Sequence, residues 1–332
     1  MDHNALPVAV DAMGGDNAPS DIIKGAELAI EAGIPVLLVG HPDVLSDISD
    51  IPTKFASEII EMGEDPASAV RKKKDSSLVR SAEAVRDGEA AAMISAGNTG
   101  ATMSSALLKI GRIRGVSRPA IATPIPVPGS ENPNILLDSG ANAECQPEWL
   151  VQFAEMGAVY ARDRFNIARP KIGLLSIGEE PGKGSPLVKE AFELLDDQSW
   201  QSRCSGDFIG NVEGRDLMNP EIDVIVTDGF TGNVALKTLE GTAKSIVSAL
   251  LEVFSSSPDA KEGAKLLAPS LLPLYETLDP ESVGGAILLG IKGVAIVSHG
   301  SSGPKAILNA ISTAHELFID KHVQHLEHVI KQ

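Results

Sequence analysis

The 332-residue chain has 28 Lys and Arg against 45 Asp and Glu, a formal net charge of −17, and 43% hydrophobic residues. This acidic balance argues against a nucleic-acid partner and against purely electrostatic attachment to anionic lipid, because both need an excess of Lys and Arg. Its two cysteines, Cys145 and Cys204, provide neither a disulfide framework nor a Cys/His metal spacing, which indicates a reduced, cytoplasmic setting.

Short apolar runs recur along the chain, each followed by a loop of Gly, Asn, Asp and Ser. They cover residues 7–10, 36–39, 92–94, 135–137, 172–177, 224–226 and 294–297. Helical spacing predicts helices over residues 20–32, 76–87, 101–108, 147–161, 186–195, 234–254 and 304–330. This alternation is typical of parallel strands buried on both faces. We therefore predict one α/β catalytic domain over residues 1–332, with three layers around a mostly parallel sheet.

No targeting or membrane-spanning segment is expected. The first ten residues lack a basic region and lead directly into a strand. The most hydrophobic stretch, residues 282–304, is interrupted by Lys292 and several glycines, so we interpret it as a short helix followed by a strand.

Residues 255–281 do not follow the alternation of strands and helices seen elsewhere in the sequence. Apolar residues recur there at helical spacing: Leu267, Leu271, Leu274, Tyr275 and Leu278. Pro269 and Pro273 argue against one straight helix, so we predict an amphipathic hairpin or two short helices projecting from the end of the preceding long helix. Such an apolar tip fits a membrane interface or a second subunit, and ordinary core packing explains it equally well.

The loops after the strands should hold a ligand, since ligands of parallel sheets bind beyond the carboxyl ends of the strands. We expect these loops to converge on one edge of the sheet. In the loop of residues 178–185, Lys183 precedes a helix start marked by Ser185 and Pro186. The loop resembles a Walker phosphate loop, but its spacing is one residue short and Gly184 replaces the magnesium-binding Ser or Thr, so a nucleotide site is not expected. Lys183 beside a helix N-terminus suits an anion or a developing oxyanion, and a surface lysine in a turn explains it equally well.

Asn233 lies in a similar loop before the helix of residues 234–254, where an amide can donate to a ligand or cap the helix. His299 is the one histidine in the loops that carry candidate site residues, and a histidine can change its charge near neutral pH. The candidate substrate-binding residues in the loops are Asp11, Gly14, Gly15, Asp16, Asn17, Gly97, Asn98, Thr99, Asn142, His299, Ser301 and Ser302.

Several chemistries lack their signatures. No G-x-G-x-x-G follows the first strand, which disfavours a nicotinamide enzyme, and no G-x-S-x-G nucleophile elbow is present. Cys145 fits an inert thiol better than an acyl acceptor. His322, His325 and His328 fit a solvated helix face better than a zinc site. No metal or cofactor is expected.

A basic run interrupts the acidic sequence. It consists of Arg71, Lys72, Lys73 and Lys74. It is either a solvated loop or a docking patch for an acidic partner.

Seven motifs in order resemble one bacterial family. They are VAVDAMGGDNAP (residues 8–19), RKKKDSS (71–77), SAGNTGA (95–101), LDSGAN (137–142), GEEPGKG (178–184), DGFTGNVALKTLEG (228–241) and HGSS (299–302). This set, over about residues 8–311, resembles the acyl-acyl-carrier-protein:phosphate acyltransferase family of phospholipid synthesis. One departure is that Ser185 and Pro186 stand where that family usually has Asn and Glu.

The resemblance implies an isocitrate-dehydrogenase-like or phosphotransacetylase-like fold, and transfer of an acyl group from acyl carrier protein to inorganic phosphate without a cofactor. It implies catalytic roles for Lys183 and Asn233, a homodimer, and a peripheral membrane contact through the helical tip. Acyl phosphate would then serve phosphatidic acid synthesis through a membrane acyltransferase at the inner face of the cell membrane. Two alternatives are a phosphotransacetylase acting on short acyl-coenzyme A and a non-catalytic membrane scaffold for lipid-synthesis enzymes.

Overall fold

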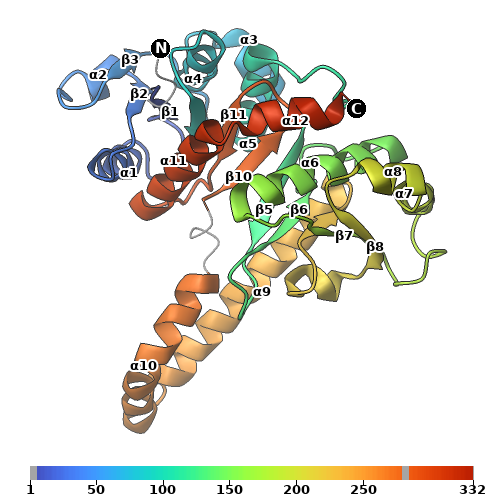
Figure 1. Ribbon diagram of the computed structural model, residues 1–332. Helices are drawn as coiled ribbons and strands as arrows, with labels where there is room; N and C mark the ends of the chain where they lie inside the picture. Colours follow the sequence, from blue (N-terminus) through green and yellow to red (C-terminus); the bar gives the residue numbers. More distant parts are fainter. Residues whose placement is uncertain (1–5, 279–283, 332) are drawn as a thin grey trace.

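In the described part of the chain, one eleven-stranded sheet runs through the body of the protein, with helices on both faces and two long helices projecting from it (Figure 1). The computed structural model describes residues 6–278 and 284–331, and no side chain is described for residue 203 or residues 272–278. The strands are β1 (Val8–Asp11), β2 (Val36–Gly40), β3 (Thr53–Phe55), β4 (Ala92–Ser95), β5 (Ala120–Ile125), β6 (Asn134–Leu137), β7 (Lys171–Leu175), β8 (Asp207–Val212), β9 (Val224–Val226), β10 (Ala286–Leu289) and β11 (Val294–Val297).

The strand order is β3-β2-β1-β4-β11-β10-β5-β6-β9-β7-β8. Pairing is parallel within β3, β2, β1, β4 and β11, and again within β6, β9, β7 and β8. Between these groups β10 is antiparallel to both its neighbours, and β5 is antiparallel to β6. The prediction of a mostly parallel α/β sheet is therefore confirmed.

Three antiparallel pairings lie between the two parallel groups: β11 with β10, β10 with β5, and β5 with β6. Each pairing reverses the strand direction, and because their number is odd, the two groups run in opposite directions. Their carboxyl ends consequently lie at opposite edges of the sheet. The expectation that all the glycine-rich loops converge on one edge is wrong. The sequence pattern identifies each strand and its loop, but strand direction depends on the long-range pairing of β5 and β10.

The helices are α1 (Ser20–Glu31), α2 (Pro42–Leu45), α3 (Pro66–Lys72), α4 (Ser77–Arg86), α5 (Thr99–Ser105), the π-helical turn η2 (Ala106–Ile110), α6 (Pro147–Phe165), α7 (Pro186–Leu195), α8 (Gln198–Arg203), the 3₁₀ turn η3 (Gly214–Met218), α9 (Gly229–Ser255), α10 (Pro258–Leu278), α11 (Pro304–Ile319) and α12 (His322–Ile330). Lys321, at φ 57°, separates α11 from α12 where one helix was predicted. The predicted short helix in residues 282–304 is also wrong, because β10 fills the gap between β11 and β5.

Alternate residues of each strand enter opposite layers. Val8 and Val10 join a core that includes residues of α1, α6 and α11, whereas Ala9 and Met93 join a core with residues of α4. In the second strand group, Leu136 and Ile225 pack with Leu236 and Leu239 of α9. These contacts place α9 on the opposite face from α6 and complete the three layers.

The projecting hairpin consists of α9 and α10 (Figure 1). A projecting helical hairpin is confirmed, but its two arms are α9 and α10. The hairpin or two short helices predicted within residues 255–281 are instead one helix, α10, which Pro269 and Pro273 do not divide, and residues 279–281 lie outside the described part of the chain. Each proline removes only one helical N–H donor, and a spacing of four residues puts both losses on the same side of the helix. Within the described residues, no helix combines the length and apolar character that crossing a membrane requires.

Candidate functional site

In the first strand group, the loops after β1 and β4 are locked together by a buried carboxylate. Asp11 Oδ2 accepts a hydrogen bond from Ser95 Oγ at 2.7 Å, and Ser95 Oγ accepts one from Gly97 N at 3.0 Å. A β-carbon on Gly14 would lie 2.8 Å from Gly97 N, so only glycine fits between these loops. Burial raises the pKa of Asp11, with hydrogen bonds from Ser77, Ser95 and Met13 opposing that rise. Asp11, Gly14 and Gly97 thus hold the loops together.

The β11 loop joins the same cluster. Gly300 O accepts a hydrogen bond from Asp16 N at 2.7 Å, and Ser302 N donates to His299 O at 3.0 Å. Gly15 lies beside this contact with φ +121°, a conformation that favours glycine. Ser302 is buried, whereas Asp16, Asn17, His299 and Ser301 are exposed. The structure therefore brings together the candidate residues from three loops of this group.

Asn98 has little capacity left for a substrate. Its Oδ1 accepts from Ala101 N at 3.0 Å as the N-cap of α5, and its Nδ2 donates to Met62 O and Glu64 O at 2.8 and 3.1 Å. Thr99, the first residue of α5, is exposed. Of this pair, Thr99 has the more accessible side chain.

In the second strand group, Asp138 organises the loop after β6. Its Oδ1 accepts hydrogen bonds from the backbone N–H groups of Ile121, Gly140 and Ala141 at 2.9–3.1 Å. Its Oδ2 accepts from Asn142 N and Asn142 Nδ2 at 2.7 and 2.9 Å. Burial raises the pKa of Asp138, and these donors lower it. Sequence analysis missed this residue, although it stands in the LDSGAN motif.

Asp138 also fixes the position of the first turn of α9. A β-carbon on Gly232 would lie 2.0 Å from Asp138 O, and one on Gly229 would lie 2.8 Å from Asp138 Oδ2. Gly229 N also donates to Asn142 O at 2.8 Å. The side chain of Asn142 is directed to Asp138 and to Pro119 O, so it supports the loop that faces α9.

Asn233 lies in the second turn of α9 and is exposed. It does not cap the helix, since Asp228 performs that role by accepting a hydrogen bond from Thr231 N at 2.8 Å. A β-carbon on Gly140 would lie 3.6 Å from Asn233 Oδ1, which places the amide beside the loop that Asp138 organises. The amide is thus accessible on a fixed turn.

Lys183 lies in the loop after β7, the neighbour of β9 in the sheet. Its backbone N–H donates to Glu180 O at 3.0 Å, and Asn211 Nδ2 donates to the same oxygen at 2.9 Å. Ser185 caps α7 by accepting from Val188 N at 3.4 Å, as predicted. Lys183 is exposed and forms no ion pair within the described parts of the chain.

α9 connects the two loop groups. Glu240 Oε2 pairs with Lys237 Nζ at 2.9 Å, and Glu240 Oε1 lies 3.3 Å from His299 Nε2. Burial would raise the pKa of Glu240, but hydrogen bonds from His299 and Lys237 lower it to about 2. Asn233 and Glu240 are seven positions apart, about 10 Å along the helix. α9 therefore carries the Asn233 amide near one end of this stretch and the partner of His299 at the other. Sequence analysis missed both Lys237 and Glu240, although they stand in the DGFTGNVALKTLEG motif.

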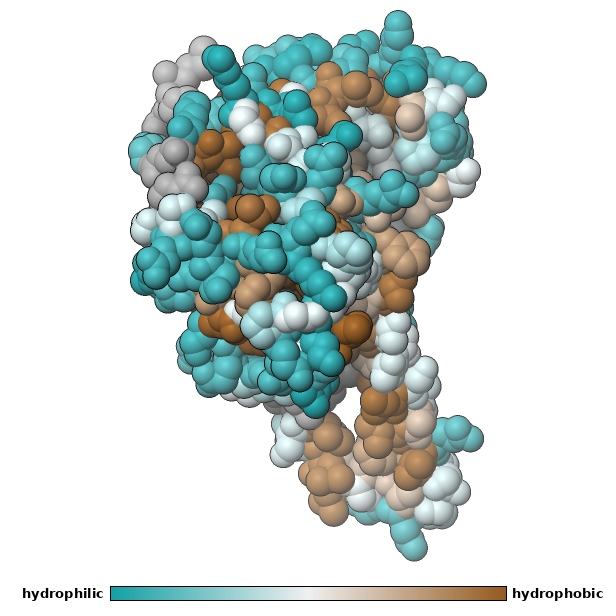
Figure 2. Space-filling view, turned by 90° about the vertical axis from the view of Figure 1, so that its right-hand side faces the viewer, coloured by the Kyte–Doolittle hydropathy of each residue, from teal (hydrophilic) through white to brown (hydrophobic). Residues whose placement is uncertain are grey.

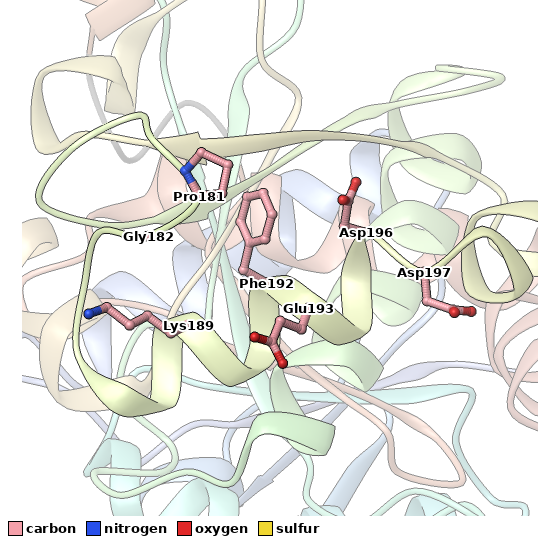
Figure 3. Close-up of a pocket in the computed structure, with 7 residues that line it drawn as sticks. All are labelled: Pro181, Gly182, Lys189, Phe192, Glu193, Asp196 and Asp197. Atoms are coloured by element: carbon pink, nitrogen blue, oxygen red, sulfur yellow. The ribbon is translucent and has the colours of Figure 1, made fainter.

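A hollow of about 500 Å³ lies between the Lys183 loop and α7 (Figure 3). Pro181, Gly182 and Phe192 line it together with Lys189, and the remaining lining residues are Glu193, Asp196 and Asp197. Three carboxylates against one ammonium repel a phosphate. This hollow is therefore a poor anion site.

The cysteines and histidines support no alternative chemistry. Burial raises the pKa of Cys145 to about 12 and that of Cys204 to about 11, so neither is an activated thiolate. His322 and His325 both contact Asp163 Oδ2, at 2.8 and 3.0 Å. His322 is buried, so the expectation of a wholly solvated histidine face is wrong. No metal-binding cluster is found in the described residues.

The basic run is only partly available to a partner. Lys73 forms an ion pair with Glu64 and donates to Ile59 O at 2.6 Å, at the end of α3. Arg71, Lys72 and Lys74 are exposed. Three of the four cations of the predicted docking patch therefore face solvent.

The hairpin carries exposed apolar residues (Figure 2). On α9, Ile246, Leu250, Leu251 and Val253 are 47–60% exposed, and on α10 Leu266 and Leu267 are 76% and 52% exposed. Leu271 is partly buried. The side chains of Leu274, Tyr275 and Leu278, which belong to the predicted membrane contact, lie outside the described part of the chain.

Solved structures place the fold in a known class. A phosphotransacetylase from Streptococcus pyogenes covers 95% of this chain and 94% of its own at 18% identity and a TM-score of 0.62. The EutD phosphotransacetylase from Staphylococcus aureus covers 95% of each chain at 17% identity and a TM-score of 0.60. The predicted phosphotransacetylase-like α/β fold is thus confirmed.

The family follows from sequence. The profile of the family described as fatty acid synthesis protein matches residues 6–325. A phosphate acyltransferase from Elusimicrobium minutum is 46% identical over 335 residues, which cover 97% of this chain and 96% of that protein. The chain belongs to this family, and the resemblance seen in the seven motifs is confirmed.

Proposed function

We propose that the protein is an acyltransferase that moves a fatty acyl group from acyl carrier protein to inorganic phosphate, giving acyl phosphate for phospholipid synthesis. The observation that supports this most strongly is the 46% identity to a phosphate acyltransferase over 97% of the chain. Acyl transfer to phosphate needs no acyl-enzyme, because phosphate is itself the nucleophile. The high pKa of Cys145, about 12, is consistent with such a direct transfer.

The proposed site comprises the Lys183 loop and the first turns of α9. A phosphate oxygen attacks the thioester carbonyl carbon, the new C–O bond forms, and the C–S bond breaks with its electron pair leaving on sulfur. Lys183 and Asn233 are the proposed donors to the oxyanion of the tetrahedral intermediate. A thiolate leaves readily, and Lys183 or His299 supplies the proton that it takes up.

The substrate-binding loops of the first strand group have a second role in this proposal. The exposed residues Asp16, Asn17, Thr99 and Ser301 lie close to His299 or on neighbouring loops. The backbone N–H of Asp16 is bonded to Gly300 O, and those of Asn17, Thr99 and Ser301 are the proposed neutral donors to phosphate. Asp11, Gly14, Gly15 and Gly97 set the positions of those loops. Holding phosphate against the thioester makes a bimolecular step nearly intramolecular.

The activity test incubates purified protein with palmitoyl-acyl carrier protein and follows the carrier thiol with and without phosphate. Phosphate-dependent thiol release, with acyl phosphate detected by mass spectrometry, is expected without added metal or nucleotide. Release that ignores phosphate would identify a thioesterase. Turnover of acetyl-coenzyme A alone would favour the phosphotransacetylase alternative. A scaffold without catalytic activity would release no thiol from either donor.

The partners of this reaction are also proposals. Arg71, Lys72 and Lys74 are exposed cations in a protein of charge −17, and they offer a docking patch for the acidic carrier protein. Replacing all three with Ser should raise the KM for the acyl carrier protein substrate and leave turnover of an acyl-pantetheine donor unchanged. An unchanged KM for the carrier substrate would place docking elsewhere.

The apolar hairpin is proposed to contact the membrane surface, where acyl phosphate passes to a membrane acyltransferase, and to contribute to a homodimer. Leu266 and Leu267 are large apolar residues with 76% and 52% exposure. The double substitution Leu266→Glu and Leu267→Glu should reduce co-sedimentation with liposomes, whereas Lys265→Glu at a neighbouring polar position tests charge alone. Unchanged co-sedimentation with a lost dimer would assign these residues to the subunit interface.

A further inference from the structure

Three neighbouring residues on the surface of α9 carry an aromatic ring, an amide and an ammonium group. Phe230 lies three residues before Asn233, and Lys237 lies four residues after it. Residues three and four apart are neighbours on a helix surface, with about 5–6 Å between β-carbons. An amide is therefore flanked by an apolar ring on one side and an ammonium on the other.

The opposite side of α9 fixes the orientation of these residues. Gly229 and Gly232 are buried against Asp138, and Leu236 and Leu239 pack with the core. Phe230 and Lys237 consequently face away from the sheet, with 66% and 52% of their side chains exposed. The order apolar, amide, cation is a fixed property of the outer face of this helix.

Phe230 has no role in the core, and a second exposed apolar residue occurs in the loop after the neighbouring strand, β7. Ile177 is 80% exposed at the start of the loop that carries Lys183. β7 and β9 are adjacent, with Leu174 opposite Val226, so both apolar side chains follow neighbouring strand ends. Each stands a few residues before a proposed catalytic residue, which suits a substrate that brings an apolar chain to that point.

Lys237 retains capacity to bind an anion. Its ammonium has three donors, and the pair with Glu240 uses one of them. The second oxygen of Glu240 faces His299 at 3.3 Å, so its charge is shared between two partners. Lys237 is about half exposed on the side of Asn233 that faces away from Phe230.

Building on the proposed acyl transfer, we propose that the two substrates are aligned along α9. The fatty acyl chain lies against Phe230 and Ile177, the thioester carbonyl lies at Asn233, and phosphate lies at Lys237. Phe230 thereby determines selectivity for chain length, and Lys237 determines affinity for phosphate. Attack of phosphate on the carbonyl runs from the Lys237 side toward the Phe230 side.

The first arm of the test measures chain-length selectivity in Phe230→Ala. The ratio of kcat/KM for palmitoyl- to octanoyl-acyl carrier protein should fall about tenfold, while the KM for phosphate changes less than about twofold. Phe230→Leu retains an apolar side chain and should keep most of the selectivity. Leu251→Ala, on an exposed apolar residue farther along α9, is the matched control and should leave the ratio unchanged.

The second arm measures phosphate dependence in Lys237→Gln. The KM for phosphate should rise about tenfold while the chain-length ratio stays unchanged, as expected for loss of one charge-assisted contact. Lys237→Arg should restore most of the affinity. Lys244→Gln, two helical turns farther on, removes an exposed lysine of the same helix and should leave the phosphate KM unchanged.

The two arms separate failure of the alignment from failure of the function. If the wild-type protein forms no acyl phosphate from either donor, the proposed function is wrong and the alignment falls with it. If the wild type is active but Phe230→Ala keeps its selectivity, or Lys237→Gln keeps its phosphate KM, the alignment alone is wrong. Loss of both parameters in both variants would indicate a general distortion of α9 and would equally contradict it.

Discussion

The loops of the two strand groups share one composition but use it differently. In the first group, the polar side chains that hold the loops together turn inward, and Asp16, Asn17, Thr99, His299 and Ser301 stay exposed. Ser95 donates to the buried Asp11, and Asn98 is directed to backbone atoms of its own and a neighbouring segment. In the second group, Asp138 performs the inward role, and Lys183 and Asn233 remain exposed. Glycine-rich loops of similar appearance are therefore divided by burial into supports and candidate reacting groups.

The largest expected effect is on turnover, and it tests whether the exposed side chains of the second group are the reacting groups. Lys183→Ala and Asn233→Ala should each lower kcat at least about 1000-fold, because oxyanion donors are typically worth 10²–10³ in rate and proton delivery adds to that. Both side chains are exposed, so the unfolding transition should stay within about 0.5 kcal/mol of wild type. Stopped thiol-release assays and urea unfolding provide the two measurements.

Near-normal turnover in either variant would remove that residue from the proposed chemistry. A large fall in stability would show instead that the residue supports the loop, which would abolish the contrast with the first group. Lys189→Ala, on an exposed lysine of the neighbouring helix α7, is a control for loss of positive charge.

The next prediction concerns the fixed turn beneath Asn233. Gly232→Ala should destabilise the protein by about 3 kcal/mol, since its β-carbon would lie 2.0 Å from Asp138 O and the backbone must shift. Gly241→Ala is the matched change on the same helix, where a β-carbon meets nothing within 4 Å. It should stabilise α9 by about 0.5–1 kcal/mol. The free energy of unfolding of both variants is measured by chemical denaturation. Equal values would contradict the close contact between Gly232 and Asp138 O.

Ser95→Ala tests the supporting role of the first group. It removes the donor to Asp11 and the acceptor of Gly97 N inside a buried cluster, and it should cost about 1–3 kcal/mol of unfolding free energy. Once folded, the variant should turn over substrate within about threefold of wild type at saturating concentrations. A drop in kcat as large as that of Lys183→Ala would place the Asp11 cluster in the chemistry.

The sequence predicts the local parts of this architecture well and the long-range parts poorly. All seven apolar runs form strands, because three to six mostly buried apolar residues before a Gly-rich loop have few other solutions. The motifs also located Lys183 on a loop. Asn233 was predicted in a loop before a helix starting at residue 234, which is wrong, because α9 begins at Gly229 and contains Asn233 in its second turn. Strands β5 and β10 carry the direction reversal, and no local pattern encodes their partners. Asp138 and Glu240 escaped notice because their importance lies in contacts with residues distant in the chain.

The smallest effect concerns Glu240, which joins the two loop groups through α9. Its pKa is lowered from its ordinary 4.5 to about 2 by donors from His299 and Lys237, against the opposing effect of burial. A carboxyl whose pKa is lower in the folded state stabilises that state above pH 4.5 and loses this contribution as the pH falls toward 2. Glu240→Gln should therefore cost about 1–2 kcal/mol at pH 7 and a smaller amount at pH 4, measured by urea unfolding at both values. An equal loss at both pH values would mean that shape rather than charge connects α9 to the β11 loop. The two loop groups would then be joined by packing alone, and His299 would have no electrostatic link to the helix that carries Asn233.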